Sequence, residues 1–300
     1  MPGEPASIDD MLARLREHQY FASRELATAL FLALKMQRLL FLEGEPGVGK
    51  TELAKAAGLC GTTLLLLQCY EGLDTASALY EWDYPWQIMA LRLAEALGET
   101  PSNDSLYRGE FLLKRPLLQA ILPDPENPDT RRVLLIDEID RADEPFEAFL
   151  LELLSDFPMS IPEYGTVRAA RTPLVVTTSN RTREVHDALK RRCLYQWIGY
   201  PERDIELAIV AARAPEAGQA LQRRAVAFVH ELRTLDLFKA PGVTETLDWC
   251  RALAALSVSE LDPQSGAGRT RSACCSSIRT TWRAWTPIRW HSVFLHRPEG

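Results

Sequence analysis

One stretch of this 300-residue chain, residues 44–51 with the sequence GEPGVGKT, constrains the fold more than any other. It follows an apolar run at 39–42 and precedes a helical pattern that begins at Thr51. Its spacing matches a loop that wraps a phosphate chain between a strand and a helix. Glycine permits the curvature that turns backbone N–H groups inward, and the helix N-terminus adds partial positive charge. The stretch therefore predicts a nucleotide-binding α/β domain.

The residue types of this loop predict how it would hold a nucleotide. We expect Lys50 to reach the β- and γ-phosphates and Thr51 to offer its hydroxyl to Mg²⁺, so the expected cofactors are ATP and Mg²⁺. A tight Gly/Pro turn with an exposed lysine is the alternative, which the flanking strand and helix disfavour. The predicted nucleotide-binding residues are Gly44, Glu45, Pro46, Gly47, Val48, Gly49, Lys50, Thr51 and Glu52.

Five apolar runs predict the strands of one sheet. They lie at 39–42, 63–69, 133–140, 174–178 and 194–199, and the third of them ends in acids. Because apolar and polar residues do not alternate in the buried runs, we expect a parallel sheet that is covered on both faces. Helical patterns between the runs indicate a five-stranded parallel sheet sandwiched by helices. A further helix is predicted over 111–122, and residues 160–172 favour a hairpin.

The character of the chain changes at Tyr200-Pro201. Beyond this point only helical patterns follow, at 202–214, 216–235 and 243–257. We therefore expect an α/β nucleotide-binding domain over 1–201 and a small all-α lid domain over 202–261.

The third predicted strand ends in two carboxylates, Asp137 and Glu138. An open α/β sheet presents its ligands at the carboxyl ends of its strands. We expect Asp137 to bind Mg²⁺ and Glu138 to polarise a water for attack on the γ-phosphorus. The alternative is a solvated acidic strand end, which the phosphate loop upstream makes less favourable.

Two further features could complete a hydrolytic site. Asn180 follows a strand expected between those carrying the loop and the acids, so its amide could hold the attacking water; an ordinary Ser-Asn turn is the alternative. The pair Arg191 and Arg192 could reach the γ-phosphate of a neighbouring subunit. A cationic helix C-terminus that interacts with its own dipole is the alternative for the arginines.

Together these motifs resemble the AAA+ ATPases over about residues 11–261. The hairpin after the acidic strand and the sequence ALKRRC at 188–193 resemble the MoxR branch. Within that branch, CYEGLD at 69–74, YEWDY at 80–84 and TLDW at 246–249 resemble the carbon-monoxide-dehydrogenase maturation (CoxD-type) ATPases. The AAA+ resemblance implies a P-loop fold, with Asn180 as sensor 1 and the arginine pair at the arginine-finger position.

The resemblance also implies partners. It implies a homo-oligomeric ring, a hexamer, that acts as a chaperone-like motor in maturing a molybdenum hydroxylase, with a von Willebrand A-domain protein beside it. The acidic, aromatic stretch 70–86 is our candidate for contacting the client, and a packed loop is the alternative. One departure is that 241–245, with the sequence PGVTE, lacks the arginine that lids of the family commonly carry there.

Composition limits the other function classes. The net charge of −7 gives no reason to expect nucleic-acid binding, which disfavours a DNA-remodelling alternative such as a helicase loader. No run is long enough to span a membrane and the cysteines form no C-x-x-C pair, so we expect a cytoplasmic protein. A small-molecule P-loop kinase and a nucleotide-gated scaffold with little turnover stay open as alternatives.

The C-terminal residues differ from the rest of the chain. Residues 265–300 hold six arginines, one acid and three of the seven tryptophans, without helical or strand periodicity. We interpret 262–300 as an aberrant tail, the product of a frameshift, and expect it to be disordered; a basic nucleic-acid-binding tail is the alternative.

Overall fold

The computed structural model divides the chain into two compact units. The described residues are 4–59, 63–98, 107–123, 131–156, 158–161, 165–168, 171–235 and 240–256. The first unit holds the described residues of Met1–His18, Ser23–Glu43 and Thr51–Trp197. The second holds those of Gln19–Ala22, Gly44–Lys50 and Ile198–Gly300. The tail expected over 262–300 lies outside the described residues.

A five-stranded sheet with the order β2-β5-β8-β1-β9 forms the core of the α/β fold. Its strands are β1 (Leu40–Gly44), β2 (Leu64–Gln68), β5 (Val133–Asp137), β8 (Leu174–Ser179) and β9 (Leu194–Ile198). The pairs β2–β5, β5–β8 and β8–β1 are parallel. The central strands β1, β5 and β8 are buried along their whole length, as their uninterrupted apolar runs predict. The predicted sheet is confirmed, and β8 lies between β5 and β1.

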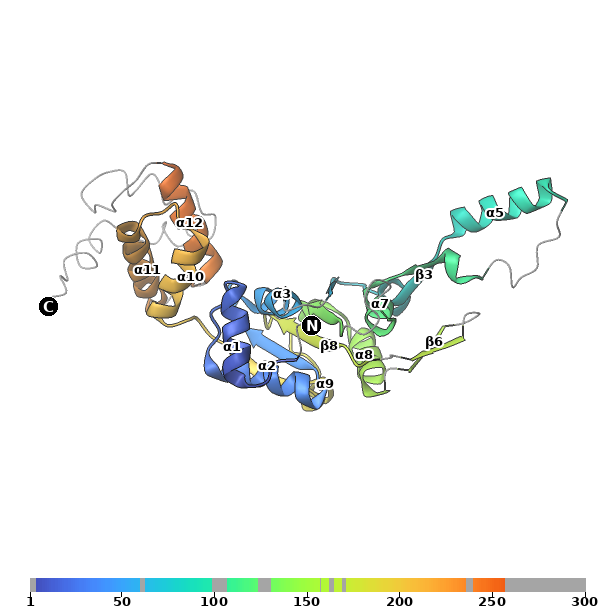
Figure 1. The fold of residues 1–300 in the computed structure, drawn as a ribbon, viewed down its shortest axis with the longest axis horizontal. Helices are drawn as coiled ribbons and strands as arrows, with labels where there is room; N and C mark the ends of the chain where they lie inside the picture. Colours follow the sequence, from blue (N-terminus) through green and yellow to red (C-terminus); the bar gives the residue numbers. More distant parts are fainter. Residues whose placement is uncertain are drawn as a thin grey trace, which may run out of the picture. The chain divides into compact units, whose positions relative to one another are not determined.

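Helices flank this sheet (Figure 1). They are α1 (Ile8–Glu17), α2 (Arg24–Met36), α3 (Lys50–Leu59), α4 (Thr75–Leu79), α7 (Pro116–Ile121), α8 (Glu144–Asp156) and α9 (Asp187–Arg192). Serine side chains cap α1 and α2, where Ser7 accepts from the Asp10 N–H and Ser23 from the Leu26 N–H. None of the helices in the described ranges is long and apolar enough to cross a membrane.

The helix predicted over 111–122 is wrong in its first part. Residues Gly109–Phe111 form a short 3-10 helix, η1, and β4 (Leu112–Lys114) pairs antiparallel with β3 (Tyr80–Trp82). Pro116 then occupies the first turn of α7, where its missing N–H costs no helical hydrogen bond. The helix α5 (Tyr84–Ala96) leads away from β3. A predicted hairpin is confirmed, formed by β6 (Pro158–Ile161) and β7 (Gly165–Arg168).

The second unit contains a bundle of three helices. They are α10 (Arg203–Arg213), α11 (Gln219–Arg233) and α12 (Val243–Ala255), which Figure 1 shows side by side. Their apolar faces form a separate core in which the rings of Phe228 and Trp249 lie 5.1 Å apart. Periodic apolar positions on each helix account for this core.

Candidate functional site

The phosphate loop follows β1 and runs directly into α3. Gly47 and Gly49 have φ angles of +76° and +96°, a left-handed conformation that favours glycine. The Lys50 ammonium is buried and donates to the carbonyl oxygens of Gly44 and Glu45, at 2.7 Å each. These bonds hold the ammonium against the loop's own backbone. The cation is therefore already positioned at the loop that we expect to hold phosphate groups.

Thr51, the next residue of α3, is hydrogen-bonded to the end of β5. Its hydroxyl donates to the Asp137 carboxylate, 3.0 Å from Oδ1 and 3.3 Å from Oδ2. The Thr178 hydroxyl at the end of β8 donates to the same Oδ1 at 2.5 Å. Asp137 is only 8% exposed. Residues at three separate places in the sequence thus gather oxygen atoms at one edge of the sheet.

This oxygen set fits Mg²⁺. The ion prefers oxygen ligands and usually retains several waters, with one or two protein ligands besides the phosphates of its substrate. The described residues contain no group of three or more His, Cys, Asp or Glu side chains arranged to hold a metal. Thr51 and Asp137 could therefore supply a minority of the ligands, as the hydroxyl and carboxylate of such a site.

Glu138 directly follows β5 in an unusual backbone conformation. Its φ of 55° and ψ of 52° are left-handed, which costs a non-glycine residue about 1 kcal/mol or more. Its carboxylate accepts from Asn180 Nδ2 at 3.0 Å and from Gln68 Nε2 at 3.1 Å, and it forms an ion pair with Arg141, whose Nε lies 2.9 Å away. Such strained residues concentrate at functional sites. The structure thus brings Glu138 and Asn180 together, with the amide bonded to the carboxylate.

The segment after β8 is held by Asp140, which is 3% exposed. Asp140 accepts from the backbone N–H of Asn180 at 3.2 Å and from the N–H and hydroxyl of Thr182, at 2.9 and 2.6 Å. It belongs to η2 (Ile139–Arg141), the 3-10 turn after Glu138. Asp140 therefore fixes the position of the Asn180 backbone, from which the side chain extends toward Glu138.

Sequence reasoning missed four residues that bond the expected catalytic groups. They are Gln68, Asp140, Arg141 and Thr178. Gln68 and Thr178 stand at or next to the carboxyl ends of strands, a position that could have identified them. Arg141 carries no comparable signal in the sequence.

The Cys69 thiol lies near the carboxylates at this edge of the sheet, and its pKa is raised. Burial raises the pKa of the Cys69 thiol to about 12, with further contributions from the negative charges of Asp137, Asp140, Glu138 and Glu147. Asp137 and Glu138 stand at and directly after the end of β5, where their negative charge would favour a bound cation.

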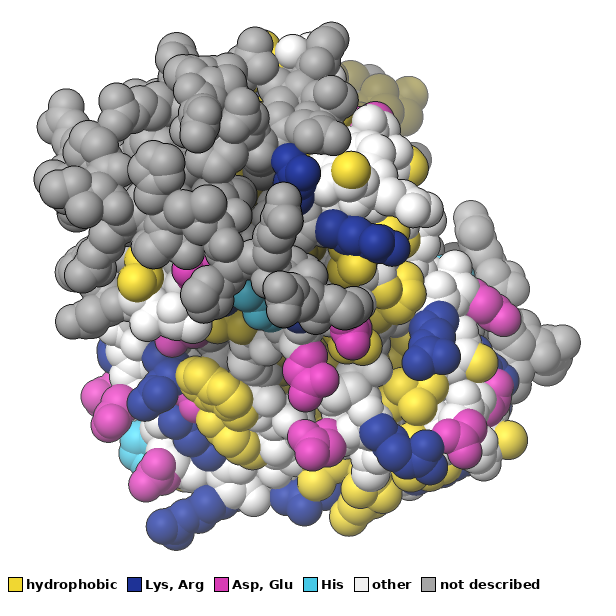
Figure 2. Space-filling model, turned by 90° about the vertical axis from the view of Figure 1, so that its left-hand side faces the viewer, with side chains coloured by type: hydrophobic (Ala, Val, Ile, Leu, Met, Phe, Trp, Pro, Cys, Tyr) yellow, Lys and Arg dark blue, Asp and Glu magenta, His cyan; other side chains and the backbone are white. Residues whose placement is uncertain are grey.

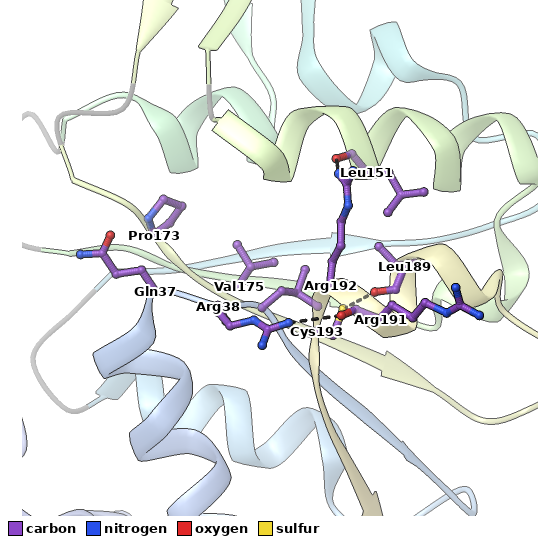
Figure 3. Close-up of a pocket in the computed structure, with 10 residues that line it drawn as sticks. Gln37, Arg38, Leu151, Pro173, Val175, Leu189, Arg191, Arg192 and Cys193 are labelled. Atoms are coloured by element: carbon purple, nitrogen blue, oxygen red, sulfur yellow. Dashed lines mark hydrogen bonds between the residues drawn. The ribbon is translucent and has the colours of Figure 1, made fainter.

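The two candidate finger arginines line a different site, a pocket of about 440 Å³ in the first unit (Figure 3). The Arg192 guanidinium donates to the Leu151 carbonyl at 2.7 Å, and the Arg191 carbonyl accepts from Arg38 at 3.2 Å. Figure 3 shows the Arg191 side chain extending away from the Arg38 guanidinium. Both arginines end α9, immediately before β9.

The structure does not bring these arginines to the acids of their own chain. Arg192 precedes β9, where the Leu194 N–H donates to the Leu39 carbonyl at the start of β1. Asp137 lies at the carboxyl end of β5, which runs parallel to β1 through β8. The two groups are thus at opposite ends of strands five residues long, which span about 16 Å.

Comparison with known proteins agrees with this geometry. Residues 39–193 match the family model of the AAA domain, dynein-related subfamily. Since the match covers more than half of the chain, the protein belongs to this AAA family, whose domain is a nucleotide-binding ATPase domain.

Two further comparisons are weaker. A solved structure from Cytophaga hutchinsonii, described as a putative ATPase, is 14% identical with a TM-score of 0.46, over 93% of this chain and 94% of that one. No curated protein matches the sequence.

Proposed function

We propose that this protein is a Mg²⁺-dependent ATP hydrolase, and that turnover drives the remodelling of a client protein. One observation carries the proposal: the Thr51 hydroxyl is bonded to the Asp137 carboxylate, and the neighbouring Glu138 is held by Asn180. A hydroxyl, a metal-binding carboxylate and a second, oriented carboxylate are the groups that phosphoryl transfer to water requires.

Binding would rest on the loop of residues 44–52. Lys50, held by the Gly44 and Glu45 carbonyls, is positioned to exchange these partners for phosphate oxygens. Thr51 and Asp137 would hold Mg²⁺, which neutralises oxygens of the β- and γ-phosphates when it is bound with ATP. The backbone N–H groups of the loop supply the remaining donors.

Glu138 would act as the general base. Its carboxylate receives hydrogen bonds from Asn180 and Gln68 and forms an ion pair with Arg141, and these contacts fix its orientation. Such a carboxylate can accept the proton of a water that attacks the γ-phosphorus. Asn180, bonded to Glu138 Oε1 at 3.0 Å, has a second amide proton that could orient that water.

Arg191 and Arg192 would act on a neighbouring subunit. Their position at the opposite ends of the strands from Asp137 supports a role in trans, in a ring of identical chains. The ring, expected to be a hexamer, would complete each site with an arginine from the next copy.

The client would contact the aromatic stretch that begins at Tyr70. Large apolar side chains of this stretch and of the adjoining α5 are more than half exposed: Tyr70, Tyr84, Trp86, Ile88, Met89, Leu93 and Leu97. Exposed apolar surface of this kind marks protein-binding sites. The resemblance of the aromatic motifs to CoxD-type ATPases is our reason to propose a molybdenum hydroxylase such as carbon monoxide dehydrogenase as client, with a von Willebrand A-domain partner.

The surface charge and the cysteines bear on the type of client and on the cellular location. Figure 2 shows Lys and Arg side chains interspersed with Asp and Glu on the face drawn, which, with the net charge of −7, favours a protein client over nucleic acid. A cytoplasmic location would suit an ATP-driven protein whose described free cysteines, Cys69, Cys193 and Cys250, are all buried.

The change Glu138→Gln tests the proposed function. We expect ATP hydrolysis to fall by about 10²-fold or more, because a general base is lost. ATP binding should persist, since the loop and Asp137 are unchanged. Turnover is measured by phosphate release and binding by calorimetry.

Glu144→Gln is the matched control, because it makes the same chemical change at an exposed position of α8. It should leave both quantities unchanged. Near-normal hydrolysis by the Glu138→Gln protein would exclude the role given to Glu138. A wild-type protein that binds ATP without turnover would instead favour a nucleotide-gated scaffold.

A further inference from the structure

Within the second unit, the start of α12 lies directly against the phosphate loop. The backbone N–H of Val243 donates to the Gly47 carbonyl oxygen at 2.9 Å, and that of Thr244 donates to the same oxygen at 3.4 Å. Two of the N–H groups that every helix leaves unpaired in its first turn are thereby satisfied by the loop. The lid thus contacts the loop through backbone groups, at the place where the sequence lacks the expected arginine.

The contact depends on a glycine at the N-cap of α12. A Cβ added to Gly242 would lie 2.8 Å from the Pro46 carbonyl oxygen and 3.0 Å from the Gly47 carbonyl carbon. The φ of Gly242 is −83° and its ψ is −177°, a conformation that any residue adopts. Glycine is therefore required here by the close approach of two backbones, and its φ and ψ impose no such requirement.

The two hydrogen bonds also fix the direction of a neighbouring donor in the loop. In a planar trans peptide, the carbonyl of one residue and the N–H of the next point in opposite directions. When the Gly47 carbonyl is held toward α12, the Val48 N–H must therefore point away from α12. Loops of this type bind phosphate through their backbone N–H groups, so the orientation of this peptide matters for binding.

A buried hydrogen-bond network connects the start of α12 to the other two helices of the bundle. Arg233 Nε donates to the Pro241 carbonyl at 2.8 Å, and the Thr246 hydroxyl lies 3.2 Å from the Gly242 carbonyl and 2.7 Å from Glu206 Oε1. The Arg233 guanidinium also bonds both carboxylate oxygens of Glu206, at 2.5 and 3.0 Å. Residues 241–242 are thus anchored to α10 and α11, so a shift at the loop is transmitted to the helices of the lid.

We infer that the start of α12 positions the Gly47–Val48 peptide for the nucleotide phosphates and couples the phosphate loop to the lid. Val243 and Thr244 act as positioning residues through their backbone N–H groups. Phosphate binding that tilts this peptide changes both hydrogen bonds to α12, and by reciprocity the position of α12 alters nucleotide affinity. The inference rests on the proposed function, since it assumes that residues 44–52 bind a nucleotide.

The change Gly242→Ala tests the inference. The added Cβ must push α12 away from Pro46 and Gly47, and it also comes within 2.9 Å of Glu245 Oε2, which accepts from the Gly242 N–H. The φ and ψ of Gly242 themselves suit alanine. We expect ATP to bind about threefold to tenfold more weakly, the change that corresponds to one neutral hydrogen bond. Gly218→Ala is the control for a change at another helix N-cap of the same unit, where an added Cβ meets nothing within 4 Å. The φ of Gly218 is 1°, which alanine does not readily adopt, so this variant tests whether a disturbed helix start alone weakens ATP binding; we expect ATP affinity to stay unchanged.

Hydrogen exchange of the wild-type protein provides a second measurement that does not depend on a variant. Amide exchange at Val243 and Thr244, followed by NMR, should change when ATP is added, and this response should be lost in the Gly242→Ala protein. A purely structural role for the contact would leave exchange at both amides indifferent to ATP.

The outcomes separate the inference from the proposed function. Wild-type affinity in Gly242→Ala, together with unchanged exchange at Val243 and Thr244, would overturn the inference and leave the ATPase proposal standing. A wild-type protein that does not bind ATP would overturn both. If Gly242→Ala does not fold, the inference is tested by whether ATP changes amide exchange at Val243 and Thr244 in the wild-type protein.

Discussion

Two groups of carboxylates are buried in this protein, and they differ in how their charge is balanced. In the three-helix bundle of α10, α11 and α12, which we propose as the lid, Glu206 has no exposed surface. Arg233 contacts both of its oxygens, His230 lies 2.8 Å from Oε2, and the Thr246 hydroxyl donates to Oε1. A guanidinium thus balances the buried negative charge in full.

At the end of β5 the balance is different. The side-chain donors that bond Asp137 within the described residues are the neutral hydroxyls of Thr51 and Thr178. Asp140 likewise accepts from two backbone N–H groups and the Thr182 hydroxyl. Hydrogen bonds satisfy these carboxylates without neutralising them.

This difference indicates a structural role for the Glu206 cluster and suits a cation-binding role for the cluster at the end of β5. Burying a charge is costly unless a partner compensates for it, and the lid cluster contains that partner. The strand-end cluster keeps negative charge available, which suits a site that binds a cation together with its substrate.

The largest effect is expected in the lid. Glu206→Ala leaves Arg233 buried without its carboxylate, so the free energy of unfolding should fall by about 3–5 kcal/mol. Denaturant unfolding measures this change. Glu216→Ala removes a glutamate of the same unit whose side chain is 50% exposed, and should cost less than about 1 kcal/mol. Equal losses in the two variants would contradict the structural role of Glu206.

Alkaline pH should destabilise the folded protein because a buried thiol lies near each group of carboxylates, Cys69 near Asp137 and Cys250 near Glu206. Burial, and then the charge of Asp137, raises the pKa of Cys69 to about 12; burial, and then Glu206, raises that of Cys250 to about 12. Below the ordinary thiol pKa of 9.0 the folded and unfolded chains hold the same protons. Between pH 9 and 12 only the unfolded chain loses them, so each thiol should cost about 1.4 kcal/mol of stability per pH unit.

Urea unfolding at pH 8, 10 and 11 measures this slope. Cys69→Ala and Cys250→Ala should each reduce the loss of unfolding free energy by about 1.4 kcal/mol per pH unit, the contribution of one thiol. A slope that neither variant changes would show that the buried thiols do not control alkaline stability.

The smallest effect is expected at Arg141, which forms an ion pair with Glu138. Arg141 Nε lies 2.9 Å from Glu138 Oε2, but the arginine side chain is 58% exposed. Arg141→Ala should therefore change the free energy of unfolding by less than about 1 kcal/mol, in contrast to the loss of the buried Arg233–Glu206 pair. A loss as large as that of Glu206→Ala would mean that the strand-end cluster, too, depends on a cation of this chain.

Much of the site follows from the order of motifs along the chain. Asp137, Glu138 and Asn180 come directly after apolar runs, and parallel strands bring their carboxyl ends to one edge. This reasoning places β8 next to β5 and explains why Asn180 reaches Glu138. The strands can be recognised in the sequence because a strand buried on both faces is an uninterrupted apolar run.

Contacts between distant segments could not be predicted in this way. The strands β3 and β4 have three residues each, too few for a periodic pattern. Glu206 lies in a helix where an acid is normally solvated, and only its tertiary partners reveal that it is buried. The contact between Gly47 and Val243 depends on how the lid packs, which no local pattern encodes.

The central claim is that the carboxylate at the end of β5 holds a metal ion together with ATP. Calorimetric titration of ATP, with Mg²⁺ and with EDTA, into the wild-type and Asp137→Asn proteins tests it most directly. Mg²⁺ should strengthen ATP binding to the wild-type protein, and Asp137→Asn should lose at least about tenfold of this gain while still binding ATP in EDTA. An Asp137→Asn protein that keeps the full effect of Mg²⁺ would show that Asp137 does not hold the metal.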